Sequence, residues 1–200
     1  MKKDILRLGI TLALYSAIAC AALAVVYTIT GPKIAGLEQE QLQASLKDLF
    51  PDADVFAPLD GVASADPSVS FSGAWKAAKG ETVMGIAIKA VGKSYGGAAS
   101  MLVGISTDRR IAGARVLSLA DTPGLGANAL SPTYFVDKSA KATFPGQFTG
   151  KPVRDPFEVK KDVIAISAST ITSKALTNIV KRSGEAGSAW LDAQTAGGSQ

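Results

Sequence analysis

The strongest constraint on the fold is an uncharged segment near the N-terminus. The 23 positions from Leu8 to Thr30 contain no charged residue, and most of them are apolar. At a rise of about 1.5 Å per residue, a helix of this length crosses the ~30 Å hydrocarbon layer of a bilayer. The sequence therefore predicts a first domain, residues 1–30, that consists of a short N-terminus and one transmembrane helix.

Two other interpretations of this segment are a cleaved signal peptide and a lipoprotein signal. A signal peptide has a shorter apolar core and a small-residue cleavage site, whereas this run continues to Thr-Gly-Pro-Lys at 30–33. The tetrapeptide Ala17–Cys20 resembles a lipoprotein processing site, but it lacks the usual leucine, and ten more apolar or neutral residues follow the cysteine. A retained helix accounts for both observations.

The charges beside the span predict its orientation. Three basic residues precede it, Lys2, Lys3 and Arg7, against one acidic residue, Asp4, and basic flanks stay cytoplasmic. We expect the rest of the chain on the other side of a bacterial inner membrane, in the periplasmic or extracytoplasmic space. That part keeps 18 of the 21 basic and 16 of the 17 acidic residues, so the pI of 9.2 does not indicate a nucleic-acid partner.

The composition excludes several kinds of chemistry. The chain has no histidine, and its one cysteine, Cys20, lies inside the apolar span. The part after the span therefore offers no disulfide, no His or Cys ligand for zinc, haem or an iron–sulfur cluster, and no Ser-His-Asp or Cys-His catalytic set. We predict no metal site, and any redox carrier is expected to be organic.

A connector helix is expected over residues 31–51. Its apolar residues follow helical spacing, and Pro51 ends the pattern. This stripe is expected to dock on the domain that follows, with a partner interface as the alternative; it consists of Leu42, Leu46, Leu49 and Phe50. Residues 52–72 are rich in Asp, Ala, Ser and Pro, which predicts an irregular, exposed stretch.

The remaining pattern predicts an α+β fold for residues 52–192. Residues 74–79 and 82–91 form one predicted hairpin, and residues 100–107 and 111–119 form another. Alternation of small and large residues over 83–88 indicates an antiparallel sheet packed with helices on at least one face. A closing helix is expected from about Ser173 to Arg182, and residues 193–200 are expected to form a flexible tail.

Two glycine-rich loops follow predicted strands. The first is Tyr95-Gly96-Gly97, and the second is Asp121–Gly126, with the sequence Asp-Thr-Pro-Gly-Leu-Gly. Glycine permits positive φ and a close backbone approach, and Pro123 fixes one dihedral angle. Such a loop, with Leu125 exposed between two glycines, suits a planar heterocycle with polar edges, although plain turns fit the same sequence.

Small hydroxyl residues gather before the closing helix. They lie within Ile166–Ser173, directly before the apolar helical pattern of 175–180. Hydroxyls at a helix start cap its free N–H groups, and those N–H groups also bind phosphate. The run is therefore either an ordinary cap or a phosphate seat to which a threonine hydroxyl could be joined.

Taken in order, these segments resemble the FMN-binding domain shared by the RnfG subunits of Rnf electron-transport complexes and by the related NqrC subunits. The resemblance covers nearly the whole chain. It is carried by Thr30–Ile34, Leu49–Ala53, Tyr95–Gly97, Val103–Ile105, Asp121–Gly126, Phe144–Lys151 and Ile166–Ala175.

The resemblance implies a covalent cofactor. In this family the last threonine of a Ser/Thr-Gly-Ala-Thr motif carries FMN through a phosphoester bond, and the matching residue is Thr170. Hydrogen bonds to the phosphate are expected from Ser167, Ser169, Thr172 and Ser173. Contacts with the isoalloxazine are expected from Tyr95, Gly96, Gly97, Asp121, Thr122, Gly124, Leu125 and Gly126.

Four positions depart from the family pattern. Ala168 replaces glycine, Ser169 replaces alanine, and Asp121 replaces glutamate. Ile164 occupies the place of an acid, with Asp162 two residues earlier. Ala168 matters if its position requires positive φ, which alanine resists by roughly 1 kcal/mol or more.

The resemblance also implies a function. The chain is expected to be a membrane-anchored subunit that relays electrons between other subunits of an Rnf-type ion-translocating oxidoreductase, matured by a flavin transferase. By itself it should turn over no small substrate. The alternatives are an NqrC-like subunit of a sodium-pumping NADH:quinone reductase, which the short chain disfavours, and a non-redox anchor or assembly protein without flavin.

Overall fold

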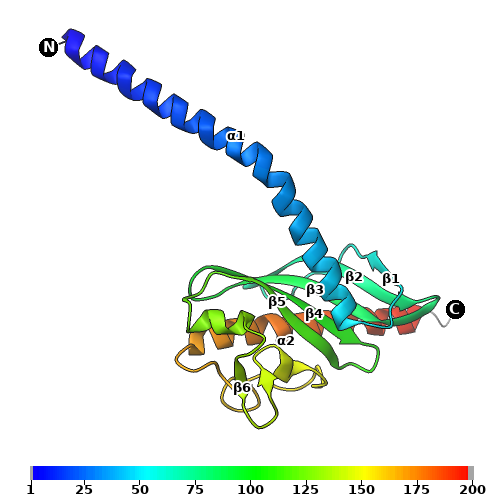
Figure 1. Cartoon of the computed structure of the whole chain (residues 1–200). Coiled ribbons are helices and arrows are strands. Elements are labelled where there is room, and N and C mark those ends of the chain that lie inside the picture. Colours follow the sequence, from blue (N-terminus) through cyan, green and yellow to red (C-terminus); the bar gives the residue numbers. More distant parts are fainter. Residues whose placement is uncertain (1, 198–200) are drawn as a thin grey trace. The chain divides into compact units, whose positions relative to one another are not determined.

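The computed structural model describes residues 2–197. The chain divides into two compact units, one up to Leu42 and one from Gln43 onward, and each is described by itself (Figure 1). The elements in chain order are α1 (Lys2–Leu49), β1 (Val55–Pro58), β2 (Val69–Lys79), β3 (Thr82–Lys93), β4 (Ala98–Ser106), β5 (Ile111–Leu119), the 3₁₀ helix η1 (Gly126–Leu130), β6 (Phe135–Asp137), β7 (Ala142–Thr143), the 3₁₀ helix η2 (Gly146–Phe148) and α2 (Thr170–Gly197).

Helix α1 contains the predicted apolar span. The helix is long and apolar enough to cross a membrane, and the side chains of residues 8–30 are all exposed. It continues through Pro32, where we predicted a boundary between a span and a separate connector helix. Proline removes one N–H of the helical ladder, and the Thr28 and Thr30 hydroxyls in the preceding turn donate to carbonyls three and four residues earlier.

The last turn of α1 belongs to the second unit, where its apolar residues are covered. Leu46, Leu49 and Phe50 are all buried, which confirms the predicted docking for these three residues of the stripe. The helix ends at Leu49, two residues before Pro51. Proline disfavours helical geometry at the residue before it, so the end of the helix follows from the sequence.

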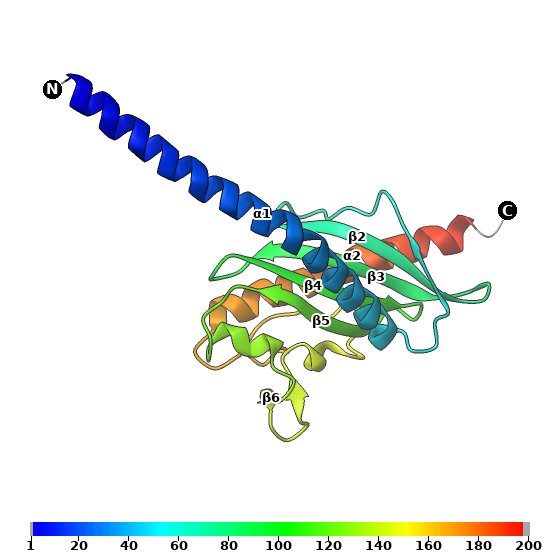
Figure 2. The ribbon, with the colours of Figure 1, turned by 45° about the horizontal axis from the view of Figure 1, so that its top comes forward.

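The second unit is built on a five-stranded antiparallel sheet. Its order is β1-β2-β3-β4-β5, so each strand pairs with its neighbour in the chain (Figure 2). Both predicted hairpins, β2-β3 and β4-β5, are confirmed. The prediction of an irregular stretch over 52–72 is wrong at both ends, because β1 forms at Val55 and β2 starts at Val69. Strand β1 is short, and its pairing with β2 sets its place in the sheet.

Helix α2 is longer than predicted in both directions. It begins at Thr170, three residues early, and continues far beyond Arg182. Residues 193–197, where we expected a tail, are helical, and 198–200 lie outside the described residues. Poor helix formers such as Gly184 and Gly187 disguise the extension. Packing explains the longer helix: at Gly187 the helix lies so close to the sheet that an added Cβ would be 2.8 Å from Ile105 Cδ1.

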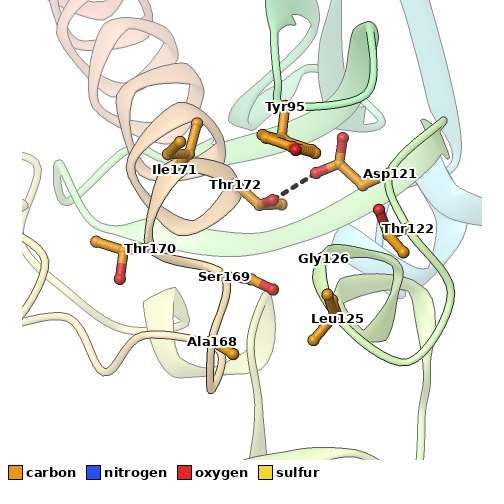
Figure 3. A pocket seen from close by; sticks show the side chains of 10 residues that line it. All are labelled: Tyr95, Asp121, Thr122, Leu125, Gly126, Ala168, Ser169, Thr170, Ile171 and Thr172. Atoms are coloured by element: carbon orange, nitrogen blue, oxygen red, sulfur yellow. Dashed lines mark hydrogen bonds between the residues drawn. The ribbon is translucent and has the colours of Figure 1, made fainter.

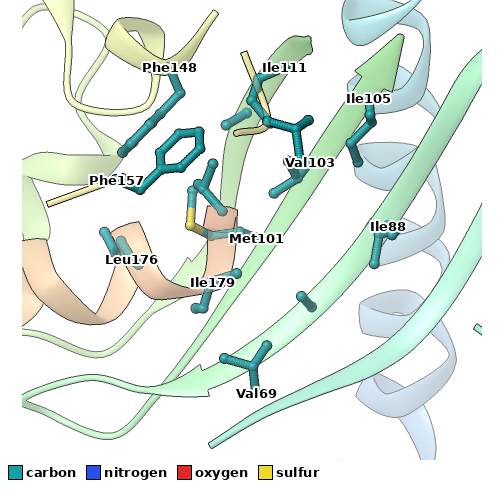
Figure 4. Close-up of a cluster of buried hydrophobic side chains, with 14 of the residues drawn as sticks. Val69, Ile88, Met101, Val103, Ile105, Ile111, Phe148, Phe157, Leu176 and Ile179 are labelled. Atoms are coloured by element: carbon teal, nitrogen blue, oxygen red, sulfur yellow. The ribbon is translucent and has the colours of Figure 1, made fainter. Parts of the chain in front are cut away.

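The core lies between α2 and the sheet (Figure 4). Strands β3 and β4 contribute branched aliphatic residues such as Ile88 and Val103, together with Met101, and α2 contributes Leu176 and Ile179. The long connection from β5 to α2 adds three buried phenylalanines, Phe144, Phe148 and Phe157. The fold class is α+β, as predicted.

Candidate functional site

A cavity opens where α2 begins. Its volume is about 430 Å³, and three segments line it: the loop after β3, the loop after β5, and the first residues of α2 with the turn before them (Figure 3). The lining residues are Tyr95, Asp121, Thr122, Leu125, Gly126, Ala168, Ser169, Thr170, Ile171 and Thr172. Both predicted glycine loops and the hydroxyl run therefore meet at one place.

The loop after β3 is held against the end of β5 by a glycine that tolerates no side chain. Ser94 N–H donates to Gly97 O at 2.7 Å, which closes the turn. A Cβ on Gly96 would lie 2.2 Å from Ala120 O. The close approach therefore requires glycine, and it leaves Tyr95 exposed at the cavity mouth.

The Asp121 carboxylate joins the three lining segments. Its Oδ1 accepts a 2.6 Å hydrogen bond from Gly96 N–H, and its Oδ2 accepts hydrogen bonds from the hydroxyls of Ser94, at 2.7 Å, and Thr172. The residue is 6% exposed. Burial acts to raise the pKa of Asp121, but the hydrogen bonds from Thr172, Ser94 and Gly96 outweigh it and lower the pKa below its ordinary value.

The start of α2 is fixed by its own hydroxyl groups. Ser173 is fully buried; its Oγ donates to Ser169 O at 2.8 Å and accepts from Ile166 N–H at 3.0 Å. The first intrahelical N–H bond runs from Ser173 to Ser169 O. The N–H groups of residues 170–172 precede it and have no partner within the helix.

Ala168 has the left-handed conformation that was in question. Its φ is +57°, so the turn before α2 does require positive φ at the position where the family carries glycine. Alanine accepts this at a cost of roughly 1 kcal/mol or more. Ala168 also lines the cavity.

Thr170 and Thr172 face opposite sides of the helix start. Residues two apart on an α-helix point about 200° apart. Thr172 points to Asp121, and Thr170 points away from it (Figure 3). Thr170 is half-buried, and among the described residues its hydroxyl makes no hydrogen bond within the chain. It is a free hydroxyl at the first residue of the helix.

Comparison with known proteins shows which family the chain belongs to. Residues 94–184 match the FMN-binding domain, and residues 1–49 match the RnfG N-terminal region. The chain is 35% identical over 171 residues to the G subunit of a proton-translocating ferredoxin:NAD(+) oxidoreductase complex of Clostridium ljungdahlii, a match that covers 82% of this chain and 80% of the relative. This chain belongs to the RnfG family.

Two further relatives show the breadth of that family. The G subunit of an ion-translocating oxidoreductase complex of Methanosarcina acetivorans is 32% identical over 88% of this chain and 90% of its own. The G subunit of a Na(+)-translocating ferredoxin:NAD(+) oxidoreductase complex of Acetobacterium woodii is 29% identical over 90% of each chain. The predicted resemblance to RnfG is confirmed, and the match of residues 1–49 to the RnfG N-terminal region favours it over NqrC.

The structure divides the residues that we predicted for this RnfG site. Those that line the cavity are Tyr95, Asp121, Thr122, Leu125, Gly126, Ser169, Thr170 and Thr172. Those outside its lining are Gly96, Gly97, Gly124, Ser167 and Ser173. The glycines shape the loops, since Gly124 has a φ of +77° and Gly97 a φ of +145°, while Ser173 stabilises the helix start and Ser167 is exposed.

Sequence reasoning missed two lining residues, Ala168 and Ile171. Ala168 was noted only as a departure from the family pattern. Ile171 is 60% exposed although it is a large apolar residue at the start of a helix. In the sequence Ile171 lies four residues before Ala175 and eight before Ile179, so it extends the apolar pattern of α2, and no sequence signal marks it as a lining residue.

Proposed function

We propose that this RnfG-family protein relays electrons through FMN that is esterified to Thr170. The observation that carries the proposal is the free Thr170 hydroxyl at the first residue of α2, on the wall of a cavity built from the family's FMN-binding segments. The relatives are named as G subunits of oxidoreductase complexes. Electron transfer between partner subunits is therefore the role that we assign to the site.

The cavity fits FMN in size and in chemistry. Its 430 Å³ is within the range of small-molecule sites, about 300–1,000 Å³. Tyr95, Leu125 and Ile171 give it exposed aromatic and apolar surface for a flat ring. The hydroxyl residues and free N–H groups at the start of α2 suit a phosphate, because a helix N-terminus favours anions.

Burial and hydrogen bonding favour Thr170 over its neighbours as the attachment point. Thr172 is 2% exposed and donates its hydroxyl to Asp121. Ser173 is fully buried and bonded on both sides. Ser169 is 8% exposed, directly before the helix. The Thr170 hydroxyl is more accessible than these three and breaks no hydrogen bond within the chain when it reacts.

The charge of the cavity supports a covalent bond. None of the ten lining residues is lysine or arginine, and one of them is aspartate. A phosphate monoester carries about −1.5 to −2 charges at pH 7 and normally binds beside cations. Esterification to Thr170 leaves a diester with a single negative charge. The bond thus lowers the charge that the site must hold and replaces the cation contacts that the lining lacks.

The attachment step uses the Thr170 hydroxyl and an external catalyst. Thr170 Oγ would form the bond to the phosphorus of an activated flavin phosphate while the bond to the leaving group breaks, and the catalyst would take the hydroxyl proton. Among the described residues the cavity lining offers no histidine or lysine as a base. We therefore assign this proton transfer to a flavin transferase.

The chain's own task is then to bind and to orient. FMN, when bound, supplies one-electron and two-electron transfer. The start of α2 would hold the phosphate, the loop with Leu125 and the Tyr95 turn would contact the ring, and Asp121 keeps these segments together. No general acid or base is needed, because electron transfer depends on position and environment.

The first experiment tests the attachment. The full chain is co-expressed with a flavin transferase, and flavin fluorescence is read on a denaturing gel. Wild type and Thr133→Ala, which removes an exposed threonine hydroxyl outside the cavity lining, should fluoresce, and Thr170→Ala should be dark. Mass spectrometry should place FMN less one water on the peptide that contains Thr170. A dark wild type with active transferase, or a fluorescent Thr170→Ala band, would show that the assignment is wrong.

A second experiment tests the orientation. We propose that the N-terminus is cytoplasmic and that residues after the span lie on the extracytoplasmic side of the cytoplasmic membrane, because Lys2, Lys3 and Arg7 precede the span. A reporter that is active only after export is fused behind Gln200 in one strain, and a reporter that is active only in the cytoplasm in another. Activity of the cytoplasmic fusion alone would refute this orientation.

A further inference from the structure

One residue of the cavity is not explained by phosphate binding. Asp121 is the one ionisable carboxylate among the ten lining residues, and it is buried within the wall. A buried charge is costly unless it is hydrogen-bonded. Three donors satisfy it, so the fold maintains a negative charge beside a place where an anionic ligand binds.

We propose that the Asp121 carboxylate lowers the reduction potential of the flavin ring, which takes the Asp121 side of the cavity because the phosphate is bound at Thr170, on the other side of the helix start. This inference rests on the proposed function. It concerns how the chain tunes FMN, beyond the binding of FMN itself.

The first step is the separation of the two negative groups. Thr172 donates to Asp121 on one side of the helix start, and Thr170 points to the other side (Figure 3). A phosphate on Thr170 is therefore turned away from the carboxylate. Repulsion between like charges disfavours any arrangement that brings the two groups closer. The part of the cavity that Asp121 lines, together with Leu125 and Thr122, is left for the ring.

The second step is the effect on the ring. Two-electron reduction of FMN takes up two electrons and, at neutral pH, one proton, so the ring gains one negative charge. The electrons come from the donor subunit of the complex and the proton from solvent. A fixed carboxylate in a wall of low dielectric opposes that added charge, and thereby favours the oxidised ring. The fixed charge should therefore shift the potential to more negative values.

A purely structural role for Asp121 is the competing explanation, and two variants separate the two roles. Asp121→Asn removes the charge and can keep the connections: the amide oxygen accepts from Gly96 N–H, and the amide NH₂ donates to a hydroxyl of Ser94 or Thr172, which can act as acceptors. Thr172→Val keeps the charge and removes one of its three donors, with little change of shape. In Thr172→Val the negative charge of the carboxylate is therefore offset by two hydrogen-bond donors and not by three.

The test is the midpoint potential of the flavinylated full chain in detergent, measured by spectroelectrochemistry. We expect a positive shift for Asp121→Asn, a negative shift for Thr172→Val, and a potential close to wild type for Asp121→Glu, which retains the charge. A merely structural residue would give the same sign in Asp121→Asn and Thr172→Val. Equal signs, or no shift in Asp121→Asn, would overturn the proposal.

Flavin loading separates this proposal from the proposed function. Each sample is also run on a denaturing gel, so the fraction of chain that carries flavin is known. A wild type without covalent flavin refutes both proposals. A loaded wild type with an unshifted Asp121→Asn refutes only the role of the charge. If Asp121→Asn does not load, Thr172→Val alone decides, because an unchanged or more positive potential there contradicts the proposal.

Discussion

The two faces of the sheet are covered in opposite ways. Toward α2, strands β3 and β4 present large residues, among them Ile88, paired with Val103. On the other face, the same strands present Gly85, Ala87 and Gly104 beside the buried Leu102, and β5 continues the glycine row with Gly113. The end of α1 covers this row, since a Cβ on Gly85 or Gly104 would lie 2.9 or 3.1 Å from the Phe50 ring.

The difference shows that α2 and the end of α1 pack on the sheet through different kinds of contact. Large side chains of the sheet fill the space toward α2, and the first turn of α2 carries the polar residues of the cavity. On the α1 face, the absence of side chains lets one aromatic ring and Leu49 approach the backbone of three strands. The contact between α2 and the sheet is built from many aliphatic side chains. The contact between the end of α1 and the sheet depends on Leu49 and Phe50.

The largest effect is expected at the ring that fills the glycine row. Phe50→Ala should destabilise the second unit by about 3–5 kcal/mol, because a 4%-exposed ring is lost and the row offers no side chains to fill the space. Denaturant unfolding of the full chain in detergent, followed by fluorescence of Trp75 and Trp190, measures it. Leu37→Ala, at a 64%-exposed position of α1, is the matched control and should change stability little. Equal losses would mean that the ring does not anchor α1.

A single added methyl group tests the same face from the other direction. Gly113→Ala should cost about 1–3 kcal/mol, because the new Cβ would lie 2.7 Å from Leu49 Cδ2. In a double-mutant cycle, Gly113→Ala combined with Leu49→Ala should cost less than the sum of the two single changes, since the clash is removed with its partner. Additive costs would show that the two positions do not press on each other.

Part of this arrangement is readable in the sequence. The alternation in β3 of Gly85 and Ala87 with Ile86 and Ile88 predicts a covered sheet, and the structure adds that both faces are covered. Strand β1 and the full length of α2 were not predictable from local pattern. Pairing with β2 decides the first, and close packing of Gly187 against the sheet decides the second.

A smaller effect is expected from a single methylene on the α2 face. Ile88→Val should cost about 0.5–1.5 kcal/mol, since the surrounding aliphatic side chains can adjust to the space. The change is the same size as Gly113→Ala, but it removes a carbon where the other adds one. The same unfolding assay compares them. If Ile88→Val proved the more costly of the two, the contrast between a tolerant and an intolerant face would fail.

The candidate site shows the same limit of sequence reasoning. The hydroxyl run and the two glycine loops were each visible, and the structure brings Tyr95, Asp121 and Thr170 to one cavity. The hydrogen bonds of Asp121 were not predictable, because they join residues 25 to 51 positions apart in the chain. Local pattern identifies the parts of a site, while long-range pairing decides which parts touch ligand and which support it.

The last prediction concerns how the unfolding free energy depends on pH at the two helix attachments. The start of α2 is tied by the buried carboxylate of Asp121, whereas the buried contacts at the end of α1 are the apolar Leu49 and Phe50, beside an exposed ion pair of Asp48 with Arg115. The folded-state pKa of Asp121 is below its ordinary value of 3.8, so its contribution to stability is complete well above pH 3.8 and is lost as the pH falls through the folded-state pKa.

The difference in unfolding free energy between wild type and Asp121→Asn should therefore be constant from pH 7 to about pH 5 and shrink below pH 3.8. Subtraction cancels the other carboxylates, which titrate in both proteins. The difference between wild type and Phe50→Ala should stay level over the same range, because no charge is involved. A level difference for Asp121→Asn, or a sloping one for Phe50→Ala, would show that the two attachments do not differ in the way the contacts indicate.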